Sequence, residues 1–310
     1  MNSAPHCPIC EQANTVRELD VRDYLTGKMF ELQLCRECGF RFTWPEPPNL
    51  EDHYPQSYRH YGALIRAFFQ AVHRRRVERW TRERGTTGNV LEVGCGHGWM
   101  LAALRKRGWN VVGLERTDES ARHAREVLGL DVHVGDVDVL GAEGQFDLII
   151  MNQVLEHLAD PMRRLQASAR LLRPGGWLIV GVPNLDSWQF RYSQEHWVQL
   201  DIPRHLGHFT PAALDGALQR AGLQFDHIRF PNLEYDPFGW TQAVLNQLGF
   251  EQNLALSWLT GQKRGKLLTP VGFLAGVLTV LLAGPSFVLS VVSWIAKAGA
   301  IMEVRASRPK

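Results

Sequence analysis

Four of the five cysteines in this 310-residue chain form two close pairs near its N-terminus. The pairs are Cys7-x-x-Cys10 and Cys35-x-x-Cys38, with 24 residues between them. Because four thiolates complete the tetrahedral shell of Zn²⁺, this spacing in an intracellular chain predicts a closed zinc ribbon. A redox dithiol is the alternative, but such a pair lies at a helix start beside a βαβ unit, and neither pair does. We therefore expect structural Zn²⁺ to be bound by the segment 1–45.

A glycine-rich loop is the second group of residues with a chemical role. Val90–Gly98 (VLEVGCGHG) predicts a buried strand that leads into glycines at three alternate positions. Glycine lets a backbone turn tightly and approach a ligand without a Cβ atom, and a helix starting near Trp99 would offer free N–H groups. A turn of purely structural use and a dinucleotide site are the alternatives, although the latter has the spacing G-x-G-x-x-G. With Glu92 on the strand, the loop resembles the nucleotide-binding motif of class I S-adenosylmethionine-dependent methyltransferases.

The resemblance implies which residues contact that cofactor. Glu115 ends the β-branched run Asn110–Leu114 and would accept both ribose hydroxyls, because a carboxylate has enough lone pairs for a diol. Asp136 would contact the adenine amine. Asn152 and Gln153 follow a strand at its carboxyl end, where open α/β sheets bind ligands. The full implied set is Glu92, Gly94, Cys95, Gly96, Gly98, Glu115, Asp136, Asn152 and Gln153.

Strands alternate with helices from Asn89 to Val182, which predicts a parallel, doubly wound sheet. Leu223–Phe230 and Ala300–Ala306 are the expected sixth and seventh strands. The resemblance thus implies an α/β fold with a seven-stranded Rossmann-like methyltransferase sheet. The segment QVLEH at 153–157 resembles the ubiquinone O-methyltransferase type, and the ribbon before such a domain is similar to that of deoxysugar C-methyltransferases.

Four domains or segments follow from these assignments. We expect a zinc ribbon at 1–45 and a linker with a basic amphipathic helix at 46–85. The methyltransferase domain comprises 86–230 plus 298–310, and 231–297 forms an insertion. Seven arginines lie between Arg66 and Arg84. A helix of this kind can lie on an anionic membrane, but we favour the leading helix of the fold, with its apolar side inward.

Several histidines follow the fifth strand, in the sequence D-x-P-R-H-L-x-H-F. The acceptor of a methyl group can need a general base with a pKa near 7, which suits histidine. We expect His205 or His208 to be this base, with Asp201 or Arg204 orienting the acceptor or the ring, and one histidine to hold the loop. His157, which follows the fourth strand, is a further candidate. A His–Asp–His metal site is an alternative that the sequence leaves open.

Residues 267–296 contain no charged side chain. This length exceeds the roughly 20 residues of a membrane-spanning helix, but Gly284-Pro285 divides it into two short pieces and basic residues flank both ends. Because the seventh strand must pair with the sixth, the chain has to leave and return on the same side. We therefore expect a helical hairpin, inserted between the last two strands, that enters one leaflet. Burial against the domain or against a homodimer partner is the alternative.

These features together predict an S-adenosylmethionine-dependent methyltransferase that modifies a glycan, lipid-linked or other amphiphilic acceptor at a membrane surface. A quinone or small aromatic O-methyltransferase is one alternative, and a cofactor-binding scaffold without turnover is another. The net charge of +2 gives no case for nucleic acid. Residues 1–20 show no apolar signal segment, so we expect a cytoplasmic protein, peripheral on the cytoplasmic face of the membrane.

Overall fold

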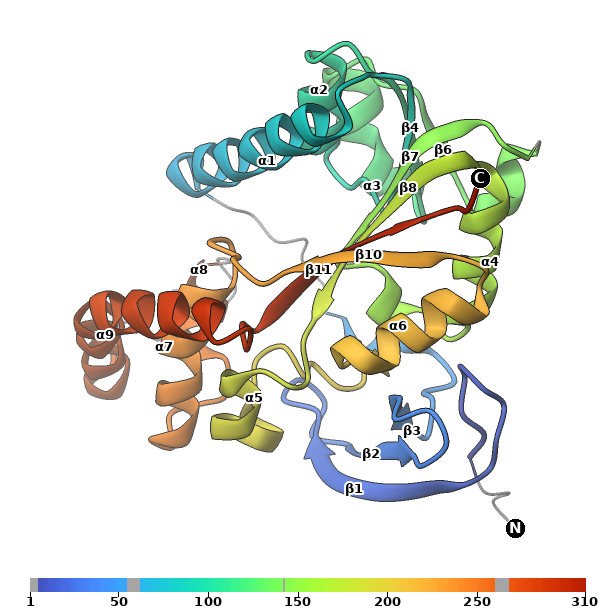
Figure 1. Ribbon diagram of the computed structural model, residues 1–310. Coiled ribbons are helices and arrows are strands. Elements are labelled where there is room, and N and C mark those ends of the chain that lie inside the picture. The colour runs from blue at the N-terminus through green and yellow to red at the C-terminus, as the bar shows by residue number, and fades with distance from the viewer. Residues whose placement is uncertain (1–4, 55–61, 142, 260–267) are drawn as a thin grey trace.

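The computed structural model describes residues 5–54, 62–141, 143–259 and 268–310 (Figure 1). Its centre is a seven-stranded sheet in the order β10-β11-β8-β7-β4-β5-β6. The five strands β4 to β8 run parallel to one another. Strand β11 is antiparallel to both of its neighbours, β8 and β10. The expected doubly wound sheet with seven strands is confirmed. The strands are β4 (Asn89–Val93), β5 (Asn110–Glu115), β6 (Val132–Val134), β7 (Phe146–Asn152), β8 (Leu172–Pro183), β10 (Gln224–Arg229) and β11 (Ile301–Ser307).

Both faces of the sheet are covered, which explains why the central strands are almost continuously apolar. Successive side chains of β7 point to opposite faces, so Leu148 and Ile150 join one hydrophobic cluster and Ile149 and Met151 join another. The first face is covered by α1 and α2 and the second by α4 and α6. The helices are α1 (Ala63–Arg84), α2 (Trp99–Arg105), α3 (Asp118–Arg122), α4 (Pro161–Leu171) and α6 (Pro211–Arg220).

The arginines of α1 mostly serve the fold. Val77 and Trp80 are buried against the sheet, and the buried Arg76 lies 3.2 Å from a carboxylate oxygen of Glu234. Arg79 pairs with Glu303 on β11. The second half of α1 is therefore the leading helix of the fold, as we favoured. The linker residues 55–61 lie outside the described residues.

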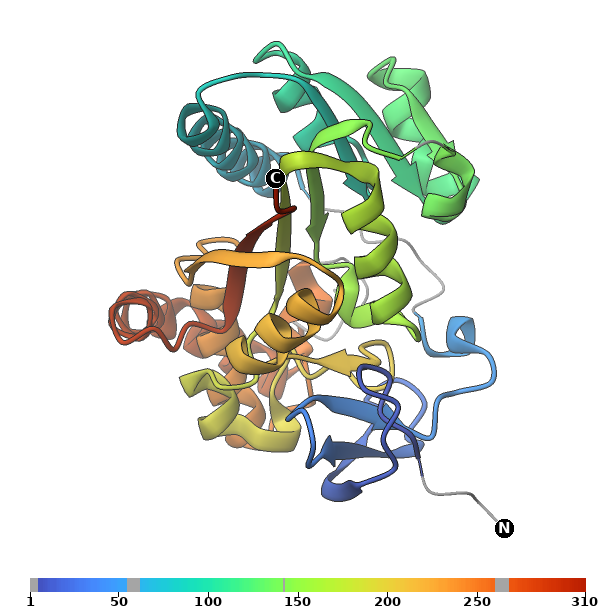
Figure 2. The ribbon, with the colours of Figure 1, turned by 45° about the vertical axis from the view of Figure 1, so that its right-hand side comes forward.

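The N-terminal segment forms a second, antiparallel sheet in the order β1-β2-β3-β9. Its first three strands are β1 (Thr15–Arg22), β2 (Met29–Cys35) and β3 (Arg41–Trp44). The fourth strand, β9 (Gly207–His208), comes from the loop between β8 and α6, with Gly207 opposite Phe42 and His208 opposite Arg41. Figures 1 and 2 show this sheet at the end of the molecule away from α1 and α2. The ribbon and the histidine loop thus share one sheet, which the domain assignment at residue 45 did not foresee.

The insertion before β11 is helical, but the expected hairpin is wrong. It contains α7 (Asp236–Gln247), α8 (Leu254–Leu259) and the continuous helix α9 (Pro270–Ile295), while α5 (Trp188–Ser193) lies before it in the chain. Residues 260–267 lie outside the described residues.

Packing against α7 explains why α9 continues through Pro285. Small residues of α9, including Ala275, Ser290 and Ser293, form its buried side. Thr241 of α7 donates a hydrogen bond of 2.9 Å to Ser286, one residue after the proline. These contacts offset the roughly 3 kcal/mol that a proline costs inside a helix. At about 1.5 Å per residue, α9 is about 39 Å long. Among the described residues it alone has the length and apolar composition of a membrane-crossing helix, and little of it is buried.

Candidate active site

The glycine loop connects β4 to α2 and leaves open space at one position. Gly94, Gly96 and Gly98 all have left-handed backbone angles, with φ of 70°, 49° and 75°. A Cβ atom on Gly94 would lie 2.6 Å from Val154, and one on Gly98 would lie 2.7 Å from Leu130. On Gly96 it would meet nothing within 4 Å. Gly94 and Gly98 are therefore needed for packing, whereas Gly96 leaves the space through which a ligand can approach the backbone.

Glu115 lies directly beside this loop. Its Oε2 accepts a hydrogen bond of 2.9 Å from the Gly96 amide, and its Oε1 accepts one of 2.9 Å from the Arg116 amide. The carboxylate is thus held at the end of β5, close to the open face of Gly96. This position fits a carboxylate that binds the diol of a ribose.

Glu92 is buried at the end of β4. Burial raises the pKa of its carboxyl to about 8, with a smaller contribution from Glu115 in the same direction. Among the described residues, its Oε2 has no hydrogen-bond partner. An unsatisfied buried acceptor costs free energy, so this oxygen fits a donor supplied by a ligand, such as the ammonium group of S-adenosylmethionine. The open space at Gly96 and this acceptor both fit that cofactor.

The other implied cofactor residues have varied surroundings. Asp136 lies 2.6 Å from the Arg164 guanidinium, so the protein itself gives this carboxylate a cationic partner. Asn152 accepts a long hydrogen bond of 3.4 Å from Arg76. Gln153 has a left-handed backbone with φ of 58°, and its amide donates to Gly181. Cys95 is buried, and its sulfur lies only 2.8 Å from where a Cβ on Gly113 would be, which is typical of a packing residue.

A cavity of about 350 Å³ lies at the carboxyl end of β7. Its polar lining comes from the ends of strands and from the histidine loop, and its apolar lining comes from α1, α7 and α8. The lining residues are Tyr54, Ile65, Phe68, Phe69, Gln153, His157, Val198, Gln199, Asp201, His205, Leu233, Glu234, Tyr235, Pro237, Phe238, Leu256 and Leu259. A pocket that is mainly apolar with a few polar groups is typical of a small-molecule site.

Two of the three candidate histidines meet at this cavity. The ring centroids of His157 and His205 are 4.7 Å apart. Nδ1 of His157 donates to the Arg204 carbonyl and Nδ1 of His205 to the Gln199 carbonyl, both at 2.9 Å. Because a carbonyl can only accept, each Nδ1 carries a proton, and Nε2 is the nitrogen with the lone pair whenever the ring is neutral. Burial, with a further contribution from His157, holds the pKa of His205 well below its usual range, so this ring is neutral at pH 7.

The third histidine, His208, does not line the cavity. It is buried in β9, where its Nε2 lies 3.0 Å from the hydroxyl of Thr43, and burial lowers its pKa to about 3. His208 is therefore positioned to hold the loop, the role that we expected of one histidine. Arg204 does not reach the acceptor through its guanidinium, because the residue is 1% exposed and binds Asp201 and Asp23 at 2.8 and 2.9 Å. Its carbonyl instead accepts the hydrogen bond from His157 and so orients that ring, the other role that we expected of Asp201 or Arg204.

Sequence reasoning missed several residues of this region. Tyr54, Glu234 and the apolar residues of α1 and α8 lie far from the motifs in sequence, and no local pattern marks them as cavity residues. Glu156 was also missed, although it lies beside His157. It is completely buried, and neither carboxylate oxygen has a partner among the described residues.

The four paired cysteines lie together, and all five cysteines are free of disulfides. The sulfurs of Cys7 and Cys38 are 3.5 Å apart, as are those of Cys10 and Cys35. A tetrahedral site with Zn–S bonds of about 2.3 Å has edges of about 3.8 Å, so this cluster could hold one metal ion.

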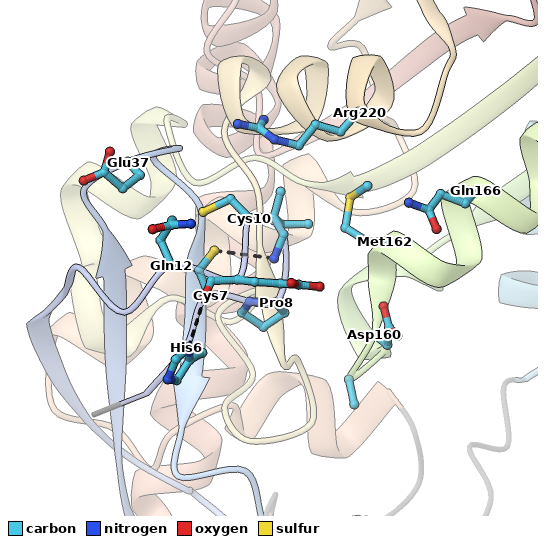
Figure 3. Close-up of a pocket in the computed structure, with 13 residues that line it drawn as sticks. His6, Cys7, Pro8, Cys10, Gln12, Glu37, Asp160, Met162, Gln166 and Arg220 are labelled. Atoms are coloured by element: carbon cyan, nitrogen blue, oxygen red, sulfur yellow. Dashed lines mark hydrogen bonds between the residues drawn. The ribbon is translucent and has the colours of Figure 1, made fainter. Parts of the chain in front are cut away.

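A wider hollow of about 830 Å³ lies beside this cluster. Figure 3 shows it between the first cysteine pair, Asp160 and Met162 at the start of α4, and Arg220 of α6. It contains none of the glycine-loop residues and none of the three candidate base histidines. The 350 Å³ cavity is therefore the better candidate for the reacting groups.

Comparison with known proteins agrees with this arrangement. Residues 56–228, more than half of the chain, match the family described as Methyltransferase domain. The ubiquinone biosynthesis O-methyltransferase of Bordetella avium is 32% identical over 163 residues, which are 48% of this chain and 66% of that protein. The enzyme of the same name from Xanthomonas euvesicatoria pv. vesicatoria is 30% identical over 51% of this chain and 71% of that protein. The chain thus spans about two thirds of the length of these relatives.

Solved structures support the fold. A putative sarcosine dimethylglycine methyltransferase from Galdieria sulphuraria superimposes with a TM-score of 0.51 at 11% identity. The match covers 84% of this chain and 96% of the other. At this identity the similarity concerns the architecture alone.

Proposed function

The chain belongs to the class I S-adenosylmethionine-dependent methyltransferases, and on that premise we propose that it methylates a lipid-linked, glycan or other amphiphilic acceptor at a membrane surface. When bound, the cofactor supplies an electrophilic methyl group on a sulfonium. The protein then has to position the acceptor, exclude water and accept a proton where the acceptor carries one. We assign cofactor binding to the glycine loop and acceptor binding to the cavity.

The glycine loop and the adjacent carboxylates would hold the cofactor. The Gly96 backbone allows close approach, Glu115 would bind the ribose, and the unsatisfied oxygen of Glu92 would accept from the ammonium group. Gln153 is both an implied cofactor residue and part of the cavity lining. It would therefore lie where the methyl group meets the acceptor.

The acceptor would occupy the 350 Å³ cavity. His157 and His205 line this region, and a neutral imidazole such as that of His205 can take a proton from a hydroxyl or amine. The buried loop that carries His205 also excludes water from one wall, because Leu206 donates a 2.7 Å hydrogen bond to the Glu156 carbonyl beside His157.

The observation that carries the choice of acceptor is the apolar side of this cavity. Phe68, Leu233 and Leu259 line it and are also 37–45% exposed, so they continue from the interior to the surface. A polar head group could then enter the cavity while an apolar tail remained on these side chains. A fully water-soluble substrate would leave them exposed.

Helix α9 supports a membrane location. It projects at the left of the molecule in Figures 1 and 2, beside α7. Most of its apolar side chains face outward, among them Phe273 at 68%, Val280 at 76% and Leu281 at 66% exposure. Exposed apolar patches of this kind mark membrane or protein contacts. Lys297 after the helix and the basic residues at 263–266 before it favour an anionic, cytoplasmic face.

A quinone or another small aromatic hydroxyl compound is the second candidate acceptor. The relatives from Bordetella avium and Xanthomonas euvesicatoria are named as ubiquinone biosynthesis O-methyltransferases. A prenylated aromatic ring is itself amphiphilic, and the aromatic side chains of Phe69 and Phe238 in the cavity would suit it. The ribbon that precedes the domain here is the feature that led us to place glycan acceptors first.

We also propose that the four-cysteine cluster binds Zn²⁺ in a structural role. The four sulfurs leave no position for a substrate once a tetrahedral ion is bound. Its contribution would be indirect, because β3 of the ribbon pairs with β9 of the histidine loop.

Methyl transfer from radiolabelled S-adenosylmethionine tests the acceptor class. The full chain is assayed on vesicles that contain a polyprenyl-phosphate sugar, a prenylated catechol or a fatty alcohol glycoside, and with the water-soluble head groups alone. We expect transfer to a vesicle-borne acceptor at least tenfold faster than to its head group. Equal rates for the two would contradict the membrane part of the proposal, and preference for the catechol would favour the second candidate.

A further inference from the structure

The most unusual feature near the cavity is a buried carboxylate with no partner. Glu156 has no exposed surface, and both of its carboxylate oxygens lack a hydrogen-bond partner among the described residues. An isolated buried acceptor of this kind costs free energy unless a donor or a cation is present. A native structure that keeps such a group directly beside a cavity-lining residue, here His157, needs a reason for it.

Two histidines lie within reach of this carboxylate. One potential ligand atom each from Glu156, His157 and His205 lie within 4.8 Å of one another. Bonds of about 2.0–2.2 Å to one ion require ligand atoms within about 4.4 Å of one another, so small side-chain rotations would let all three bind a single ion. The three groups come from two separate segments, the turn at Leu155–His157 and the loop before β9.

The two rings are oriented as metal-binding histidines usually are. Nδ1 of His157 donates to the Arg204 carbonyl, and Nδ1 of His205 donates to the Gln199 carbonyl. A hydrogen bond from one ring nitrogen to a backbone carbonyl fixes the tautomer and makes the other nitrogen the ligand. Nε2 is therefore the nitrogen of each ring that would bind a metal.

From this geometry we propose that Glu156, His157 and His205 form a second metal site, for a divalent transition-metal ion. Two imidazoles and one carboxylate suit ions such as Zn²⁺, Mn²⁺, Fe²⁺ and Co²⁺, and three protein ligands leave further positions open. Since His157 and His205 also line the cavity, those positions face the acceptor. With the ion bound, these two ring nitrogens would no longer act as bases. The open positions would instead take an oxygen of the acceptor and make its hydroxyl easier to deprotonate. This last role rests on the proposed function, whereas ion binding does not.

The burial of Glu156 supports the need for a cation, because a bound ion would stabilise a buried carboxylate that has no partner among the described residues. The ligand set also differs from the His–Asp–His site that the sequence left open, since the carboxylate is Glu156 rather than Asp201.

Cobalt binding tests the site in the full chain, with one equivalent of Zn²⁺ already in the ribbon. Co²⁺ is added as the probe and followed by its visible absorption. We expect one further equivalent to bind without a thiolate-to-cobalt charge-transfer band, since this site has no sulfur. Glu156→Gln and His205→Gln should each weaken binding at least tenfold. The matched controls Glu195→Gln and His196→Gln change exposed neighbours of the same types and should bind as the wild type does.

Calorimetric binding of S-adenosylmethionine checks that each variant is folded, because the glycine loop is separate from the three ligands. If no Co²⁺ binds beyond the ribbon, or if neither ligand variant weakens binding, the site is overturned. If Co²⁺ binds as expected but no vesicle-borne acceptor is methylated, the proposed function fails and the metal site stands. If methylation proceeds while no second ion binds, the metal site fails and the function stands.

Discussion

The Arg204 guanidinium donates a hydrogen bond of 2.9 Å to the carboxylate of Asp23, and both side chains are buried, with exposed fractions of 2% and 0%. Arg204 belongs to the loop that carries His205, and Asp23 follows β1 of the ribbon. The same guanidinium donates at 2.7 Å to the His53 carbonyl, and Nδ1 of His53 lies 2.7 Å from the Asp23 carboxylate. A buried polar network thus joins the ribbon to the wall of the cavity.

We expect Asp23→Asn to destabilise the protein by about 1.5–3 kcal/mol, because it removes one of the two carboxylates that accept from the buried Arg204 and leaves Asp201 as the other. The free energy of unfolding in urea measures this. Glu18→Gln is the control, since it removes an exposed ion pair with Arg41 and should cost less than about 1 kcal/mol. Similar losses in the two variants would show that the network adds nothing beyond a surface pair.

Removal of Zn²⁺ from the ribbon should separate cofactor binding from turnover. The loop with His205 is held by β3–β9 pairing and by the Thr43 hydroxyl, which donates to the His205 carbonyl at 2.6 Å. The glycine loop follows β4, which belongs to the seven-stranded sheet and not to the ribbon sheet. We therefore expect Cys35→Ser, which removes one ligand of the ribbon ion and none of the second proposed site, to abolish methyl transfer while calorimetry still detects S-adenosylmethionine binding. Loss of both together, or of neither, would contradict this division.

The variant Gly96→Ala should lose cofactor affinity at least tenfold in calorimetry, because its Cβ enters the open space beside Glu115. Gly129→Ala is a matched control. Both glycines have left-handed φ angles, 49° and 58°, and neither Cβ would meet an atom within 4 Å. Each should therefore cost about 1–2 kcal/mol of stability through backbone strain. Only Gly96→Ala should weaken cofactor binding. If the two variants bind S-adenosylmethionine with equal affinity, the cofactor does not bind beside Gly96.

Serine substitution of Phe273, Val280 and Leu281 should release the protein from anionic vesicles in flotation experiments, with little change in melting temperature. These side chains are exposed, so their loss removes membrane contact and not core packing. The control triple variant changes Leu25, Met29 and Val127, which are exposed apolar residues elsewhere. If the α9 variant floats normally but converts a dimer to a monomer, the apolar face is a homodimer interface instead.

Stability should fall between about pH 4 and pH 8 through Asp236. Burial raises the pKa of this carboxyl from 3.8 to about 8, although the Trp294 indole N–H donates to it and opposes the shift. A raised pKa in the folded state means that its contribution is fully present below pH 3.8 and is lost as the pH rises towards 8. Asp236→Asn should reduce this decline by up to about 1.4 kcal/mol per pH unit, as urea unfolding at several pH values can measure. If the free energies of unfolding of wild type and Asp236→Asn change with pH in parallel, Asp236 is not the source of the decline.

The sequence alone determined the parts of this protein that depend on local patterns. The apolar runs at 146–151 and 177–182 and the glycines at 94, 96 and 98 identified the sheet, its parallel order and the cofactor loop. The four cysteines were likewise recognisable by spacing and do converge. These features are local because strand burial, tight turns and metal ligation impose fixed residue types at fixed intervals.

Tertiary structure decided which side chains share a site. It made α9 one helix by packing it on α7, turned Arg204 inward to Asp23, and placed His208 in the ribbon sheet. It also brought Glu156 and His157 against His205, about fifty positions later in the chain. Sequence spacing does not determine these outcomes, because the partner of a buried polar group depends on which distant segments pack around it.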